Sequence, residues 1–144
     1  MHKILEIFNN LMDTSSRNEK EDILRANKDN ELFKDILKFV YDPYIVTGLS
    51  AKKLYKMIDF STPYTELKDV RELMNYLVTH NTGRDTDVAT VQQFVMSQEE
   101  EYEWLYNGIA TKNIVAGITA TTINKVYGED FIDVLKVMLA ENYF

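Results

Sequence analysis

The stretch KNIVAGITATTINKVYG (112–128) carries residue types that bind phosphate groups. Thr119 predicts a helix N-cap, and a helix start exposes unpaired N–H groups and a partial positive charge that can hold a phosphate. Gly117 would let the backbone approach such a ligand closely. Further donors in and before this helix are Thr121, Thr122, Lys125, Lys112 and Asn113. An ordinary capped helix explains the same residues, and the stretch taken alone favours that simpler interpretation.

A second candidate for phosphate binding is the lysine cluster, which comprises Lys52, Lys53 and Lys56. Three lysines within five positions create a local positive field that attracts a phosphate backbone, although a solvated basic loop would have the same sequence. The net charge of −7 counts against nonspecific nucleic-acid binding, because such binding depends on Lys and Arg meeting phosphates. Binding to DNA therefore requires the acidic residues to lie apart from the lysines. Asp and Glu are concentrated at 19–22, 99–103 and 129–133.

The chain lacks a recognisable catalytic set. His2 and His80 lie far apart in sequence, and the 5 glycines are scattered and form no phosphate loop. Without an Asp-Gly pair, the Lys-x-Asp-Gly motif of nucleotidyltransferases is missing. The carboxylates of residues 99–101 point in different directions on a helix, so we expect a solvated face and no metal site. We expect this chain alone to catalyse no reaction and to hold no cofactor.

Composition limits the remaining classes of protein. Cysteine is absent, which excludes disulfides, Cys-based zinc sites and thiol catalysis and fits a cytoplasmic location. The first residues do not form a signal peptide, because Glu6 interrupts the apolar run. No apolar run approaches the roughly 20 residues that a membrane span needs. We expect no membrane partner.

Apolar residues recur at helical spacing along the chain, and no alternating strand pattern persists. We predict one all-α domain over residues 1–144, with about six to eight helices. Ser16 with Glu19 predicts a capping box, and Asp29 or Asn30 caps the next helix. Ser61-Thr62-Pro63 predicts the start of a helix. The buried stripe of that helix is Leu67, Val70, Met74 and Leu77.

Several segments, in order along nearly the whole chain, resemble the N-terminal DNA-binding domain of ATP-dependent DNA ligases, particularly those of bacteriophages. ANKDNELFKDILKFVYDPYIVTGL (26–49) matches best, with RNEKEDIL (17–24) before it. HNTGRDTDVATVQQFV (80–95) resembles the middle of that domain, where a Thr-Gly turn divides two helices. Residues 112–128 resemble its closing turn and helix, and LKVMLAENYF (135–144) is similar to the lead-in to the catalytic domain.

This resemblance implies a monomeric all-helical domain that lies over the minor groove of nicked double-stranded DNA, in replication and repair. Its partners would be that DNA and the catalytic domains of the parent ligase, which use ATP and Mg²⁺. The implied DNA-binding residues are Lys52, Lys53, Lys112, Asn113, Gly117, Thr119, Thr121 and Lys125, with Gly83 and Arg84 as weaker candidates. No residue is implied to be catalytic, and the chain ends before any catalytic lysine. We expect either a fragment of a ligase or a free-standing relative that cannot ligate.

The sequence departs from the family pattern at two places. Ile114-Val115-Ala116 replaces the basic residue usual before the closing glycine, which puts one phosphate contact in doubt. Tyr127-Gly128-Glu129-Asp130 replaces the usual Pro-Gly and adds acid. The alternative function is a helical protein–protein interaction module without DNA binding, which the acidic balance and Tyr102, Trp104 and Tyr106 favour. For Trp104 we expect core packing.

Overall fold

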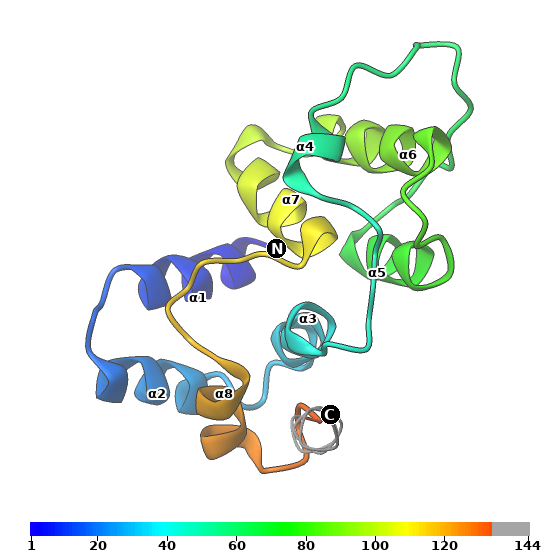
Figure 1. Cartoon of the computed structure of the whole chain (residues 1–144). Helices are drawn as coiled ribbons and strands as arrows, with labels where there is room; N and C mark the ends of the chain where they lie inside the picture. The colour runs from blue at the N-terminus through cyan, green and yellow to red at the C-terminus, as the bar shows by residue number, and fades with distance from the viewer. Residues whose placement is uncertain (134–144) are drawn as a thin grey trace. The chain divides into compact units, whose positions relative to one another are not determined.

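The computed structural model of the chain describes residues 1–133. These residues form eight α-helices and one short 3-10 helix, with no strand among them (Figure 1). The all-α prediction is therefore confirmed. The resemblance noted at 135–144 lies outside the described residues.

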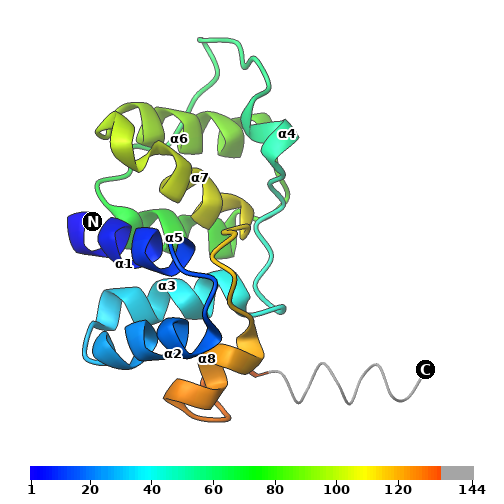
Figure 2. The same cartoon turned by 90° about the vertical axis from the view of Figure 1, so that its left-hand side faces the viewer.

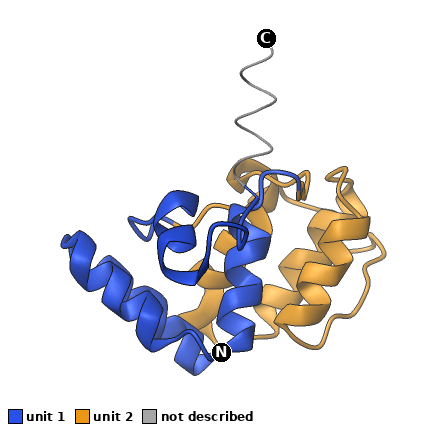
Figure 3. Ribbon diagram, turned by 90° about the horizontal axis from the view of Figure 1, so that it is seen from below, with its two compact units in different colours: residues 1–44, 115–144 blue, residues 45–114 orange. Residues whose placement is uncertain are grey.

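The chain divides into two compact units (Figure 3). The first unit comprises Met1–Tyr44 and Val115–Phe144, and the second comprises Ile45–Ile114. Helices of the first unit are α1 (His2–Met12), α2 (Arg17–Ala26), α3 (Glu31–Tyr41) and α8 (Ala120–Tyr127). Those of the second are α4 (Ala51–Leu54), α5 (Val70–Thr79), α6 (Asp85–Met96), the 3-10 helix η1 (Glu100–Tyr102) and α7 (Glu103–Thr111). Each unit is described by itself.

Local capping and apolar spacing define the helices of the first unit. The Ser16 hydroxyl accepts a hydrogen bond from the backbone N–H of Glu19, and the Asn30 side chain accepts one from that of Phe33. Each bond satisfies one of the donors that a helix start leaves unpaired. Phe8 of α1 meets Phe33 of α3 edge to face, with ring centroids 5.4 Å apart. The helices are therefore fixed by caps at their starts and by an aromatic contact in the core.

The second unit is built around α7, which packs against both α5 and α6 (Figures 1 and 2). Phe94 of α6 and Tyr106 of α7 form an edge-to-face pair with centroids 4.9 Å apart. The phenol of Tyr76 on α5 donates to the buried carboxylate of Asp87 on α6 at 2.8 Å. An apolar pair and a polar pair thus join the three helices.

One predicted helix start is wrong. Residues 61–63 lie in a loop, and α5 begins at Val70 after Asp69, whose carboxylate accepts from the backbone N–H of Glu72 at 2.9 Å. The loop backbone finds another partner, because the N–H of Thr65 donates to the hydroxyl of Thr90 on α6 at 3.0 Å. The Thr65 N–H therefore forms a tertiary hydrogen bond in place of the helical hydrogen bond expected from a helix starting at residues 61–63.

Two glycine turns of the second unit touch through their backbones. Gly48 has φ +71°, and a Cβ placed on it would lie 2.2 Å from the carbonyl oxygen of Asn81 and 2.8 Å from the nitrogen of Gly83. A Cβ on Gly83 would lie 2.3 Å from the carbonyl oxygen of Gly48. The loop before α4 and the loop before α6 can approach this closely only without side chains.

Replacing Gly48 by alanine is expected to lower the free energy of unfolding by about 3 kcal/mol, because left-handed strain adds to a displaced backbone. Gly128→Ala is the matched control, since Gly128 also has positive φ, at 120°, but no atom lies within 4 Å of its added Cβ. Gly128 has ψ 149°, a conformation that is essentially restricted to glycine, so we expect the control to cost about 2 kcal/mol from backbone strain alone. Urea denaturation of both variants measures the difference, and equal losses would contradict the close approach of the two turns.

Candidate nucleic-acid interface

The residues predicted to bind DNA fall in both units. Gly117, Thr119, Thr121 and Lys125 belong to the first unit. Lys52, Lys53, Lys112, Asn113, Gly83 and Arg84 belong to the second. Each group is therefore a surface of its own unit.

The start of α8 has the capped form expected from the sequence. The Thr119 hydroxyl accepts from the backbone N–H of Thr122 at 3.3 Å, and Thr121 is exposed in the first turn. Gly117 has φ +69°, a conformation that glycine adopts without strain. The first turn of α8 is thus accessible, as a phosphate contact requires.

The space beside Gly117 holds a lysine of the same chain. Lys20 of α2 is only 9% exposed, and its ammonium group donates to the carbonyl oxygen of Ala116 at 3.1 Å. A Cβ on Gly117 would lie 2.0 Å from the Lys20 Nζ. The sequence predicted that the glycine makes room for a ligand, and the structure shows that it makes room for Lys20.

A buried carboxylate gathers three cations where α2 meets α8. The Glu21 side chain is 5% exposed, and its oxygens lie 3.2 Å from Lys125 Nζ, 3.8 Å from Arg17 Nε and 3.7 Å from Arg25 Nη2. We call Arg17, Glu21, Arg25 and Lys125 the Glu21 cluster. Arg25 also pairs with Asp22 at 2.8 Å, so three positive charges face two carboxylates and one positive charge remains. The expectation that the acid of 19–22 is segregated from the phosphate site is wrong, because Glu21 pairs with Lys125.

Tyr127 ties the other end of α8 to α2. Its phenol donates to the carbonyl oxygen of Leu24, the last buried residue of α2. Burial raises the pKa of Tyr127 to about 12, so the phenol stays protonated and remains a donor at neutral pH. This bond and the Glu21 cluster together hold α8 against α2.

In the second unit, two predicted lysines line one hollow of about 380 Å³. Lys53 of α4 donates from its ammonium group to the carbonyl oxygen of Gly48 at 3.1 Å. The ammonium group of Lys112, the residue after α7, donates to the carbonyl oxygen of Ile45. Backbone of residues 45–50 completes the wall, and we call this site the Lys53–Lys112 hollow. Side chains far apart in sequence therefore meet at one surface.

The other predicted residues of this unit lie differently. Lys52 is exposed on α4, whereas Lys56 pairs with Asp85 at 3.0 Å, so one lysine of the cluster meets acid. Asn113 is exposed, and its backbone N–H donates to the carbonyl oxygen of Gly108 at 2.8 Å. Gly83 and Arg84 precede α6. Arg84 is exposed, and a Cβ on Gly83 would lie 2.5 Å from Lys53 Nζ.

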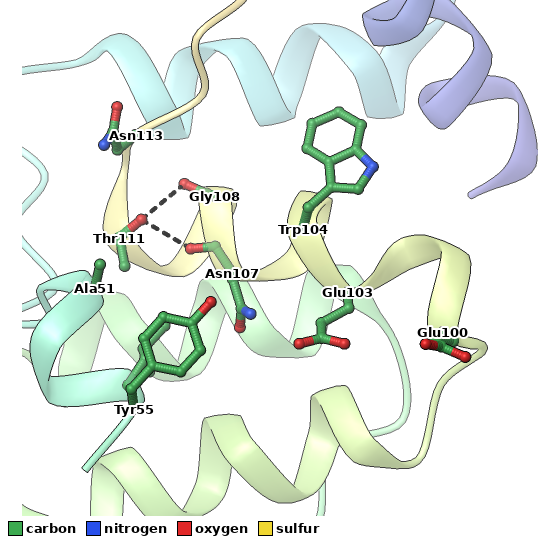
Figure 4. Close-up of a pocket in the computed structure, with 10 residues that line it drawn as sticks. Ala51, Tyr55, Glu100, Glu103, Trp104, Asn107, Gly108, Thr111 and Asn113 are labelled. Carbon is green, nitrogen blue, oxygen red and sulfur yellow. Dashed lines mark hydrogen bonds between the residues drawn. The ribbon is translucent and has the colours of Figure 1, made fainter.

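A second hollow, of about 410 Å³, has different chemistry (Figure 4). Tyr55, Glu100, Glu103 and Trp104 line it, and we call it the Trp104 hollow. Trp104 is 39% exposed, so the expectation that it packs in the core is wrong. Figure 4 shows Trp104 and Glu103 leaving α7 on different sides. The ring of Tyr55, which Figure 4 shows on the same side of α7 as Glu103, and the two carboxylates suit a positively charged group.

Sequence reasoning missed the Glu21 cluster and Lys20. The i, i+4 spacing of Arg17, Glu21 and Arg25 was a usable signal, because residues four apart share a helix face. The contacts of Glu21 with Lys125 and of Lys20 with Ala116 join segments about a hundred residues apart. No local pattern indicates them.

Residues 1–133 contain neither a metal-binding group nor a membrane-spanning helix. In this range, no group of three or more His, Cys, Asp or Glu side chains is arranged to hold a metal ion. None of the helices in the same range is long and apolar enough to cross a membrane.

Removing the charge of Glu21 is expected to destabilise the fold, because three cations would lose the carboxylate that α2 and α8 share. We expect Glu21→Gln to lower the free energy of unfolding by about 2 kcal/mol in urea denaturation. The matched control is Asp22→Asn, which removes the same charge from an exposed neighbour that also pairs with Arg25, at 2.8 Å. That control should cost roughly 0.5 kcal/mol. Equal costs would show that the cluster does not hold α8.

Comparisons with known proteins give no family assignment for this chain. The sequence matches no protein-family model, and neither curated proteins nor solved structures provide a match. The likeness to ligase DNA-binding domains thus rests on the sequence motifs, and the function drawn from it is a proposal.

Proposed function

We propose that this chain is the DNA-binding domain of an ATP-dependent DNA ligase and that it grips nicked duplex DNA through phosphate and minor-groove contacts. The observation that carries the proposal is the Lys53–Lys112 hollow, where two lysines implied by the resemblance line one surface. The chain would act by binding alone. The catalytic domains of the parent ligase would supply the step that uses ATP and Mg²⁺.

The hollow suits a phosphate for electrostatic reasons. The Lys53 ammonium group is bound to a carbonyl oxygen, and a carbonyl is neutral, so the positive charge is retained. An ammonium group has three donors, so a lysine held by one carbonyl can still donate to a phosphate oxygen. Phosphate contacts position a protein on the duplex without reading sequence, which a ligase needs because nicks occur in any sequence.

The start of α8 offers a second phosphate contact. Its exposed N-terminal turn has the free N–H groups and partial positive charge that favour anions. The Glu21 cluster beside it carries a net positive charge. These features support Thr119, Thr121 and Lys125 as contacts, and Gly117 serves indirectly by accommodating Lys20.

One observation favours the alternative, a protein–protein interaction module. The Trp104 hollow combines two carboxylates with exposed Tyr55 and Trp104. Acid repels DNA, whereas an aromatic and acidic surface accepts an Arg or Lys side chain of a protein partner. This hollow would then be the binding site, and the lysines would be solvated.

DNA binding is tested by titrating the full chain against nicked and intact duplexes at two salt concentrations. We expect salt-sensitive binding that weakens roughly tenfold in the double variant Lys52→Glu/Lys53→Glu at low salt. Lys112→Gln should reduce the dependence of log K on log salt by about one, because it removes one phosphate contact. The charge-matched comparison is Lys53→Glu alone against Lys68→Glu, since each reverses one charge and Lys68 is an exposed lysine outside both hollows.

Two outcomes would contradict the proposal. Equal weakening by Lys68→Glu would show that only net charge matters. Absence of binding at low salt would exclude a DNA-binding role for this chain. Tight binding of an Arg-rich peptide that Glu103→Gln and Trp104→Ala both abolish would instead support the interaction module.

A further inference from the structure

The loop from Tyr55 to Tyr64 exposes large apolar side chains that nothing in the second unit covers. Phe60 is 100% exposed and Met57 is 97% exposed. Tyr55 and Tyr64 are also exposed. Large exposed apolar patches often mark interaction sites, whereas single exposed apolar residues are common on any protein surface. Figures 1 and 2 show the loop extending beyond α6.

Hydrogen bonds hold both ends of this loop on α6. Gln92 donates from its side-chain amide to the carbonyl oxygens of Leu54 at 2.8 Å and Lys56 at 2.9 Å. At the other end, the N–H of Thr65 donates to the Thr90 hydroxyl. The two ends of the loop are thus anchored to residues two positions apart on α6, which reduces the entropy lost when the loop binds a partner.

The tip of the loop is also ordered. Asp59 accepts from the backbone N–H and from the hydroxyl of Ser61, both at 2.8 Å. The N–H of Thr62 donates to the Asp59 carbonyl oxygen at 2.9 Å. The two hydrogen bonds from Ser61 lower the pKa of Asp59, so its carboxylate stays charged and turned toward Ser61. Phe60 follows directly and is presented at the tip.

The charge around the loop indicates what occupies it. Lys52 and Lys53 precede the loop, and Lys53 also lines the Lys53–Lys112 hollow. Within residues 52–64 the only acidic residue is Asp59, whose oxygen is engaged by Ser61. Lys56 pairs with Asp85, so the positive charge beside the loop is that of Lys52 and Lys53. Two lysines followed by an aromatic tip match a phosphate backbone with stacked bases, since aromatic rings stack on any base.

We propose that loop 55–64 places Phe60 against the bases at the nick of the bound duplex, with Lys52 and Lys53 on the adjacent phosphates. This inference rests on the proposed function and adds how the domain distinguishes a nick from intact DNA. Inserting a ring requires unstacking of a base step. A nick interrupts one strand, so unstacking costs less there than in an intact duplex.

The test uses the full chain and duplexes that carry 2-aminopurine beside a nick or at the same position in intact DNA. Its fluorescence rises when the base unstacks. We expect the wild-type chain to raise the signal on nicked DNA, and Phe60→Ala to abolish the rise and weaken nicked-duplex binding about tenfold. Binding to intact duplex should change less than twofold, and Phe60→Tyr should restore the signal.

Met96→Ala is the control, because Met96 is a large exposed residue at the end of α6 in the same unit. Met96→Ala should leave the affinity for both duplexes and the 2-aminopurine fluorescence unchanged. Unchanged signal and affinity in Phe60→Ala would overturn the inference while the proposed function stands. An equal loss on nicked and intact DNA would also overturn it, because Phe60 would then not select nicks. Absence of all DNA binding by the wild-type chain would overturn both proposals.

Two other occupants of the loop are separate outcomes. Phosphatidylserine vesicles that bind the wild-type chain but not Phe60→Ala, with DNA binding unchanged, would make the loop a membrane contact and overturn the inference. Concentration-dependent dimers in sedimentation that Phe60→Ala abolishes, again with DNA binding unchanged, would make a second copy the occupant and overturn it equally.

Discussion

Hydrogen bonds from lysine ammonium groups to backbone carbonyl oxygens position the proposed phosphate contacts. Lys20 binds Ala116, Lys53 binds Gly48 and Lys112 binds Ile45. Gly117, next to Ala116, leaves space for the Lys20 ammonium group, and Gly83, which touches Gly48, leaves space for that of Lys53. Since a carbonyl carries no net charge, this bond fixes Lys20 and Lys53 without neutralising them. The glycine turns therefore determine where positive charge is held.

This arrangement reconciles a net charge of −7 with a surface for DNA. A bound phosphate interacts with the local electrostatic field at its site, and the net charge of the whole chain matters less. Lys56 shows the contrast, because its pairing with Asp85 removes most of its field. In the Glu21 cluster, one carboxylate orders three cations, and Asp22 neutralises a second equivalent of positive charge through Arg25. Acid also lies near the lysines, because Thr111 lines both the Lys53–Lys112 hollow and the Trp104 hollow, which holds Glu100 and Glu103.

The parts of the fold that depend on local chemistry could be predicted from the sequence. Ser16, Asn30 and Thr119 cap their helices as expected, because each cap involves residues only three apart. The start of α5 could not be predicted, because Thr90 lies 25 positions from Thr65, the residue whose backbone it binds. The prediction that Trp104 packs in the core was wrong, because the spacing of the apolar residues indicates a helix but not which side of that helix is exposed. The meeting of Lys53 and Lys112 likewise depends on tertiary packing.

The distribution of contacts over two units bears on affinity. A few phosphate contacts on either unit alone would bind weakly, because each adds only a modest electrostatic gain at physiological salt. Since the units belong to one chain, the second contact is intramolecular once the first has formed, and its effective concentration is high if one duplex reaches both. The same reasoning extends to the catalytic domains of a parent ligase, which would add contacts by closing around the DNA. Under the proposed function, weak binding by each surface would let the parent ligase leave the duplex after a nick is sealed.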